Sequence, residues 1–148
     1  MHLLVKSACL LLLLVATASS AWSSDGRVLS FEGDVRVNGQ PITADTVFYR
    51  EDNIVTAAGA SVKIVLSDNS VLDLEGDSEI EINDYNFSAS DPEENTSQIG
   101  VLAGTLRYVS GKIAKDDPAN VSFSAGTSTI GVRGTFISIS VCPDEGCD

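Results

Sequence analysis

An arginine between two glycines is the most distinctive polar pattern in the sequence, in Gly131-Val132-Arg133-Gly134-Thr135. Glycine gives the backbone unusual freedom, and a guanidinium can bind a carboxylate or phosphate through two parallel hydrogen bonds. Gly131, Arg133, Gly134 and Thr135 are therefore the candidate binding residues. The segment is too short for a phosphate-binding loop and lacks the Lys-Ser or Lys-Thr ending of such loops. In so acidic a chain, we expect Arg133 to tie the turn together by bonding a local carboxylate or carbonyl group.

Acidic residues are concentrated between positions 68 and 84, where seven of 17 residues are Asp or Glu. Alternate residues of a strand share one face, so these carboxylates can offer oxygen ligands to a hard cation such as calcium. This pattern supports an alternative function, an exported carbohydrate- or calcium-binding module that uses the acidic sheet face. The sequence has no calcium-binding loop motif, and a solvated face that protects solubility is the simpler interpretation, so we predict no metal site. The acidic residues are Asp68, Asp73, Glu75, Asp77, Glu79, Glu81 and Asp84.

Residues for nucleophilic catalysis are missing from most of the chain. The one histidine, His2, lies at the N-terminus. A region without histidine contains no Ser-His-Asp or Cys-His system and no histidine-ligated metal site. Carboxylates are plentiful, but no motif selects two of them as a glycosidase pair. The sequence therefore predicts a protein that is not an enzyme and has no cofactor.

The first 21 residues resemble a secretory signal peptide. Lys6 supplies the positive start, an apolar stretch runs from Ala8 to Ala16, and small residues continue to Ala21. Cleavage after Ala18 or after Ala21 fits this pattern, and we expect the latter. A membrane anchor needs about 20 apolar residues, so we expect no membrane span after cleavage. Residues 22–148 then form the exported domain, which is periplasmic or secreted.

Two cysteines, Cys142 and Cys147, enclose the spacer Pro-Asp-Glu-Gly near the C-terminus. Exported compartments are oxidising, and this spacer favours a tight turn, so we predict a structural disulfide in a turn at 142–147. The alternative is a redox or metal-binding dithiol. It fits less well, because redox pairs are usually spaced Cys-x-x-Cys and two thiolates alone make a poor metal site.

The charge of the chain limits its partners. The sequence has 9 Lys and Arg against 21 Asp and Glu, a net charge of −12, and loss of Lys6 with the leader gives 8 − 21 = −13. Such a field repels phosphate backbones and anionic lipid, so we expect no nucleic-acid partner. None of these features determines the oligomeric state.

Hydrophobic alternation recurs along the mature chain, and no long stretch has a helical period, so the sequence predicts an all-β domain. Asn38-Gly39 is a strong hairpin turn signal, and residues 88–97 form the one long loop. Short strands that end at Gly, Asn or Asp fit a β-sandwich or a short irregular β-solenoid, in a single compact domain with its core at 26–141. The predicted strands are 28–31, 34–37, 61–66, 70–74, 78–82, 98–109, 120–125, 127–130 and 135–141.

A series of motifs resembles successive parts of the FecR domain family. The likeness covers roughly residues 26–141. In the N-terminal half the motifs are Gly33-x-Val35, Asp52-x-Ile54-x-Thr56-Ala57-Ala58-Gly59 and Leu66-Ser67-Asp68-Asn69-Ser70-Val71-Leu72-x-Leu74. In the C-terminal half they are Gly104-x-Leu106, Val109-Ser110-Gly111-Lys112 and Thr129-Ile130-Gly131-Val132-Arg133-Gly134-Thr135.

The resemblance implies an exported or periplasmic all-β module of a Gram-negative bacterium, without known catalysis. In the best-known members the module is joined through a transmembrane helix to a cytoplasmic anti-sigma segment, and it relays iron-siderophore status from an outer-membrane transporter. We expect no cytoplasmic segment here, because the sequence starts with the leader. The expectation is a non-enzymatic binding, scaffolding or regulatory module whose partner is an envelope protein or a cell-envelope component.

Overall fold

The structure is a computed structural model and describes residues 23–142. This part of the chain is almost entirely β, so the all-β prediction is confirmed. The strands are β1 (Gly26–Glu32), β2 (Val35–Val37), β3 (Gln40–Pro41), β4 (Val47–Phe48), β5 (Asn53–Thr56), β6 (Ser61–Leu66), β7 (Val71–Leu74), β8 (Ser78–Asn86), β9 (Thr96–Val109), β10 (Val121–Ala125), β11 (Ser128–Gly131) and β12 (Phe136–Val141). The helical segments are η1 (Pro92–Glu94), α1 (Lys112–Asp116) and η2 (Pro118–Asn120).

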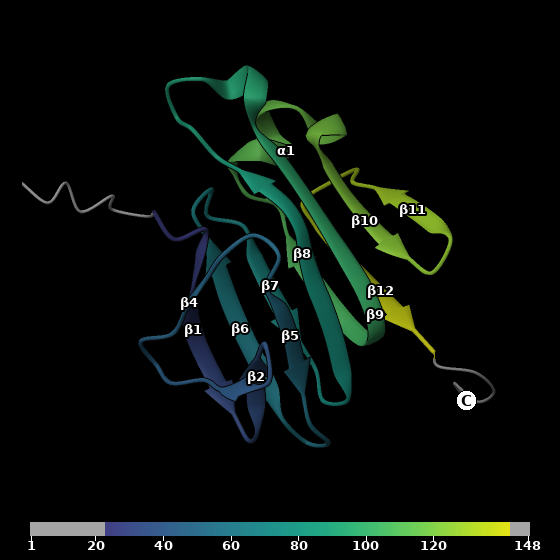
Figure 1. The fold of residues 1–148 in the computed structure, drawn as a ribbon. Helices are drawn as coiled ribbons and strands as arrows, with labels where there is room; N and C mark the ends of the chain where they lie inside the picture. Colours follow the sequence, from purple (N-terminus) through teal and green to yellow (C-terminus); the bar gives the residue numbers. More distant parts are fainter. Residues whose placement is uncertain (1–22, 143–148) are drawn as a thin grey trace, which may run out of the picture.

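The strands form a curled, mostly antiparallel sheet, a half-barrel in which the long strand β9 belongs to both halves (Figure 1). The first part of β9 pairs with β8 and, in parallel, with β10. Its last part pairs antiparallel with β7 and β12. The strand order is therefore β3-β2-β5-β8-β9-β10-β11 through one half, the β8 half, and β4-β1-β6-β7-β9-β12 through the other, the β7 half.

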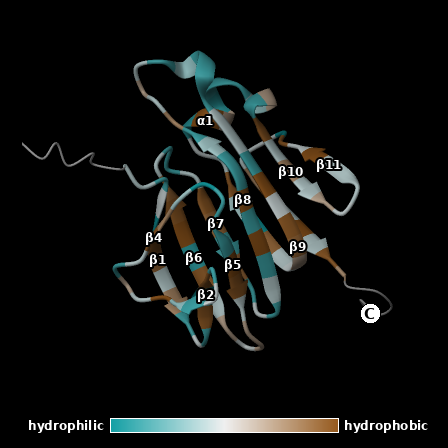
Figure 2. Cartoon of the chain, in the orientation of Figure 1, coloured by the Kyte–Doolittle hydropathy of each residue, from teal (hydrophilic) through white to brown (hydrophobic). Residues whose placement is uncertain are grey.

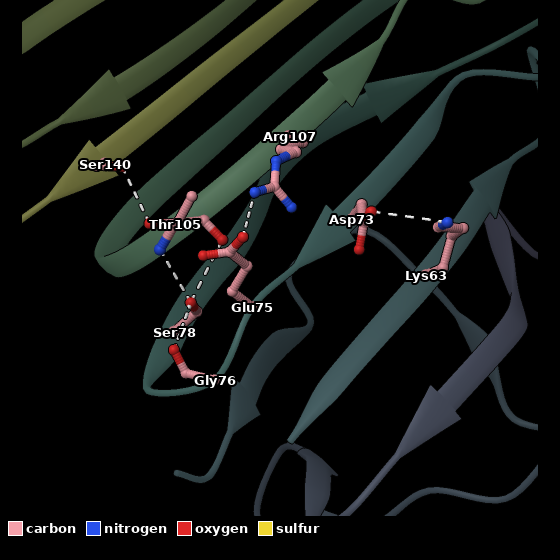
Figure 3. A network of polar contacts seen from close by, with 8 residues as sticks. All are labelled: Lys63, Asp73, Glu75, Gly76, Ser78, Thr105, Arg107 and Ser140. Carbon is pink, nitrogen blue, oxygen red and sulfur yellow. Dashed lines mark hydrogen bonds and ion pairs between the residues drawn. The ribbon is translucent and has the colours of Figure 1, made fainter. Parts of the chain in front are cut away.

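β9 passes from one half to the other at Gly104, which has a φ of +76°. Residues with a Cβ adopt this conformation only at a cost. A Cβ here would lie 2.5 Å from the carbonyl oxygen of Asp77 and 2.5 Å from the Cα of Ser78, so it would clash with the start of β8. The backbone N–H of Thr105 donates to Ser78 Oγ at 2.9 Å, which joins the two strands at the bend (Figure 3). The crossing therefore requires glycine.

One apolar core joins the two halves. Inward side chains alternate with outward ones along β6, β7 and β8, which produces the hydrophobic banding of the strands in Figure 2. Tyr108 in the β7 half meets Phe123 of β10 edge to face, with ring centroids 5.0 Å apart. Each fully buried large apolar side chain stabilises the fold by about 1.5–3 kcal/mol. The fully buried set includes Phe48, Ile54, Ile64, Leu72, Leu74, Ile80, Ile82, Ile99, Leu106 and Ile113.

The sheet has open edges at both ends. One end is formed by β3 and β4, which have two residues each. At the other end, β11 pairs only with β10, and β12 pairs only with β9, among the described residues. Neither β11 nor β12 contains a charged residue or a proline. Charges and prolines are common protections of an edge strand, and β11 and β12 have neither.

Most predicted strands are present, and Asn38-Gly39 forms the predicted turn between β2 and β3, with φ values of +49° and +81°. The sequence left a sandwich and an irregular solenoid open, and the structure has a curled, mostly antiparallel half-barrel around one core. The prediction missed β3, β4, β5 and the short helix α1. In the part of the chain that the structure describes, no helix has the length and apolar character needed to cross a membrane. Cys147 lies outside the described residues, so the Cys142–Cys147 disulfide stays a prediction.

We expect Gly104→Ala to reduce the free energy of unfolding by about 2–4 kcal/mol, because the substitution adds both a clash and a left-handed backbone cost. Gly126→Ala is the matched control. Gly126 also has a positive φ, +57°, but nothing lies within 4 Å of the point where its Cβ would be, so only the backbone cost of about 1 kcal/mol applies. Urea denaturation measures both variants, and equal losses would contradict the role given to the Gly104 crossing.

Candidate functional site

The segment Gly131–Thr135 forms the turn from β11 to β12, and a buried side chain and two hydrogen bonds hold it in place. Val132 is buried in the core, with 3% of its surface exposed. At the end of β9, Ser110 Oγ donates to the carbonyl oxygen of Gly134 at 2.8 Å. The Ser110 N–H donates to the carbonyl oxygen of Thr135, also at 2.8 Å. The turn is therefore held by Ser110 and Val132.

Arg133 does not hold this turn. Its side chain is exposed and makes no hydrogen bond or ion pair with any residue between 23 and 142. The expectation that Arg133 bonds a local carboxylate or carbonyl group is wrong: Arg133 makes no such bond among the described residues, and Ser110 bonds the turn carbonyls instead. The Ser110 role was missed, although the residue lies in one of the motifs that carry the family resemblance.

A groove of about 620 Å³ lies beside this turn. The candidate residues Gly131 and Arg133 line it, whereas Gly134 and Thr135 are exposed but do not. Two of the four candidate residues thus adjoin the groove, and their role in binding stays a prediction. The remaining lining residues are Pro118, Ala119, Val121, Ser122, Thr129 and Val132. Their contribution depends on β10 lying next to β9, a long-range pairing that the sequence pattern does not reveal.

The acidic residues of positions 68–84 do not form one binding face. Asp73 lies in the β7 half and pairs with Lys63 at 3.6 Å, and Glu75 forms an ion pair with Arg107 (Figure 3). Glu79, in the β8 half, accepts a hydrogen bond from Asn53. Within the described residues, no group of three or more His, Cys, Asp or Glu side chains is placed to hold a metal ion. The calcium-binding alternative therefore gains no support from this geometry.

Asp68 is a buried carboxylate with 1% of its surface exposed. Its Oδ1 accepts hydrogen bonds from Ser70 Oγ at 2.6 Å and from the Tyr85 hydroxyl at 3.1 Å. Its Oδ2 accepts from the N–H of Ile113 at 3.3 Å. A Cβ on Gly111 would lie 2.5 Å from Oδ2. The start of α1 can therefore lie this close to Asp68 only because residue 111 is glycine. The carboxylate is engaged on both oxygens and is structural.

A second polar cavity, of about 390 Å³, contains two carboxylates, Asp25 and Glu51. Burial raises the pKa of the Asp25 carboxyl, and the nearby Arg50 opposes this shift. The Arg50 N–H donates to Asp25 Oδ2 at 2.8 Å, so this carboxylate already holds a backbone turn. The arrangement supports a structural role for Asp25 at the entry to β1.

The fold and these sites define a class of protein: in its described part, an all-β domain whose buried carboxylates serve its structure and which exposes uncharged strand edges and, beside a groove, the unpaired Arg133. The chain belongs to the FecR protein family, whose family model matches residues 52–146. Family members are regulatory and signalling proteins of the bacterial envelope and are not known as enzymes. No curated protein and no solved structure matches the chain. Residues 26–32 precede the matched region but pair with β6, so they belong to the same sheet.

Two buried tyrosines make the fold sensitive to high pH. Burial raises the pKa of the Tyr85 phenol far above its usual value near 10, and the neighbouring Asp68 charge raises it further. Burial, with a further contribution from Asp68, raises the pKa of Tyr108 to about 12. The folded state therefore holds these protons more tightly than the unfolded state. The stability they contribute is complete below about pH 10 and is lost as the pH rises through the folded-state pKa values.

We predict that Tyr85 and Tyr108 ionise only when the protein unfolds. Phenolate absorbance is measured against circular dichroism during an alkaline titration of Tyr49→Phe, which removes the only other tyrosine of the chain. The two signals should change together above about pH 10. Phenolate absorbance that rises fully while the fold is intact would contradict the burial of both phenols.

Proposed function

We propose that the chain is a non-enzymatic, exported regulatory module that docks an extended segment of another envelope protein onto its open sheet edges. Membership of the FecR family supports a regulatory role in the envelope. One observation carries the docking proposal. In a chain of net charge −12, the two strands at one end of the sheet, β11 and β12, carry no charge at all. An uncharged edge without proline is a ready template for an added strand.

The hydrogen-bonding groups of β12 support this proposal. The Ser110 N–H donates to the carbonyl oxygen of Thr135, which makes these two residues a hydrogen-bonded antiparallel pair. Bonded pairs recur at every second residue, so Ile137 and Ile139 bond β9. The main-chain groups of Phe136, Ser138 and Ser140 therefore point to the free edge. An extended partner segment can pair with them without disturbing β9.

Exposed apolar side chains lie beside this edge. Phe136 is the most exposed large apolar residue in the described part, at 57%, and it lies opposite Val109, which is 39% exposed. On the next strand, Val71 lies opposite Val109. Strand addition gains affinity from the main chain and specificity from side chains in alternate positions. This row of three apolar residues provides contacts for the side chains of a segment added at β12.

The chemistry of the other polar groups supports binding over catalysis. Both oxygens of Asp68 bond protein groups, and Asp73 and Glu75 are paired with cations. The net negative charge disfavours nucleic acid as the partner. A protein segment is the partner that an uncharged sheet edge recognises best, and the signal-like leader agrees with a periplasmic or secreted location.

We expect Phe136→Lys to abolish capture of the envelope partner, because lysine puts a charge at the edge and removes the largest exposed apolar contact. Leu29→Lys is the matched control. Leu29 is 54% exposed, but it lies in β1, which pairs with β6, and not in either of the uncharged edge strands β11 and β12. Cross-linking pull-down from envelope extract, with thermal unfolding of each variant, measures the effect. Capture that falls equally in both variants, or that survives in Phe136→Lys, would contradict docking at β12.

A further inference from the structure

Arg133 differs from most arginines of this protein in having no counter-charge. Each of the other arginines of the described part forms an ion pair, except Arg27, which is exposed and has none. The paired residues are Arg36 with Asp34 at 3.1 Å, Arg50 with Asp84 at 3.6 Å, and Arg107 with Glu75. Carboxylates outnumber Lys and Arg by more than two to one in the sequence, so an arginine without a carboxylate partner is unusual here. Its guanidinium can still form hydrogen bonds with an anion from outside the chain.

The acidic residues that adjoin the groove lining in the sequence do not neutralise Arg133. Asp116 and Asp117 immediately precede Pro118, which lines the groove. Asp117 Oδ1 accepts the N–H of Ala119 at 3.0 Å and caps η2. Neither carboxylate forms an ion pair with Arg133 among the described residues. The charge of Arg133 is therefore available to a ligand.

The groove combines this charge with an apolar base and an open strand edge. Val121 and Val132 line it and are almost completely buried, with 1% and 3% of their surfaces exposed. Thr129 and Gly131 belong both to the groove lining and to β11. Arg133 lies two residues beyond the end of β11. A segment that pairs with the free edge of β11 therefore ends or continues close to Arg133.

We propose that this groove binds an acidic side chain of an extended peptide segment that pairs with the free edge of β11. The proposal rests on the proposed function, because β11 is the second of the two open edges to which that function assigns docking, and it names the chemistry of a segment docked there. Apolar side chains of the segment contact the base of the groove, and its Asp or Glu carboxylate receives two parallel hydrogen bonds from the Arg133 guanidinium. Lysine cannot replace arginine in this geometry, because its single ammonium does not form the paired contact.

Peptide capture by the immobilised full-length mature protein tests the proposal. One pool contains short extended peptides of varied Val, Ile, Phe and Thr, with one Asp placed at each position in turn. The matched pool has Asn in place of Asp. Wild type should capture the Asp pool about ten-fold more strongly than the Asn pool, in line with a charge-assisted bidentate contact. Arg133→Gln should lose this preference, Arg133→Lys should weaken it because only the paired contact is lost, and Arg27→Gln should retain it.

Several outcomes would overturn the proposal. They are equal capture of the two pools by wild type, no capture of either pool, and an Asp preference that survives in Arg133→Gln. Unfolding midpoints of all variants exclude loss of folding as the cause. Failure here is separable from failure of edge docking. If the two pools bind equally and Phe136→Lys still abolishes partner capture, edge docking stands and only the carboxylate site is rejected.

Discussion

The buried carboxylate of Asp68 is the interaction on which the arrangement of the two halves depends. It lies in the turn between β6 and β7 and bonds the hydroxyl of Tyr85, which belongs to β8 in the opposite half. It also accepts the N–H of Ile113 at the start of α1, and the Asp68 carbonyl accepts the N–H of Lys112 at 2.7 Å. One residue thus joins three segments that are distant in sequence. A buried charge is tolerated only when its oxygens are hydrogen-bonded in this way.

The position of the proposed binding surface follows from this junction. The contact with Asp68 fixes α1 after β9, and η2 then leads the chain into β10, which runs parallel to β9. A parallel neighbour needs such a crossover, whereas antiparallel neighbours are joined by short turns. β11 and the Arg133 turn follow β10, and Ser110 anchors that turn to the end of β9. The groove and both unprotected edges therefore lie in the segment that this crossover positions.

The sequence revealed local structure better than long-range pairing. The alternation of apolar and polar residues predicted most strands. The pair Asn38-Gly39, whose residues tolerate a positive φ, predicted the turn between β2 and β3. Alternation identifies which side chains share a face of a strand, but not which strands share a half of the sheet. Asp73 and Glu79 were therefore expected on one acidic face, although their strands pair with different parts of β9. Arg133 was identified as a candidate, but the sequence did not reveal that Ser110, 23 residues away, supplies the hydrogen bonds that hold its turn.

The unfolding free energy of Asp68→Asn, measured by urea denaturation against Asp73→Asn, tests the central claim most directly. Asparagine keeps the size of the side chain but replaces one acceptor oxygen with a donor, which faces the N–H of Ile113 or the groups of Ser70 and Tyr85. The account predicts a loss of about 2–4 kcal/mol for Asp68→Asn. It predicts less than about 1 kcal/mol for Asp73→Asn, because that ion pair is partly exposed. Similar small losses in both variants would contradict the claim that Asp68 holds the two halves and α1 together.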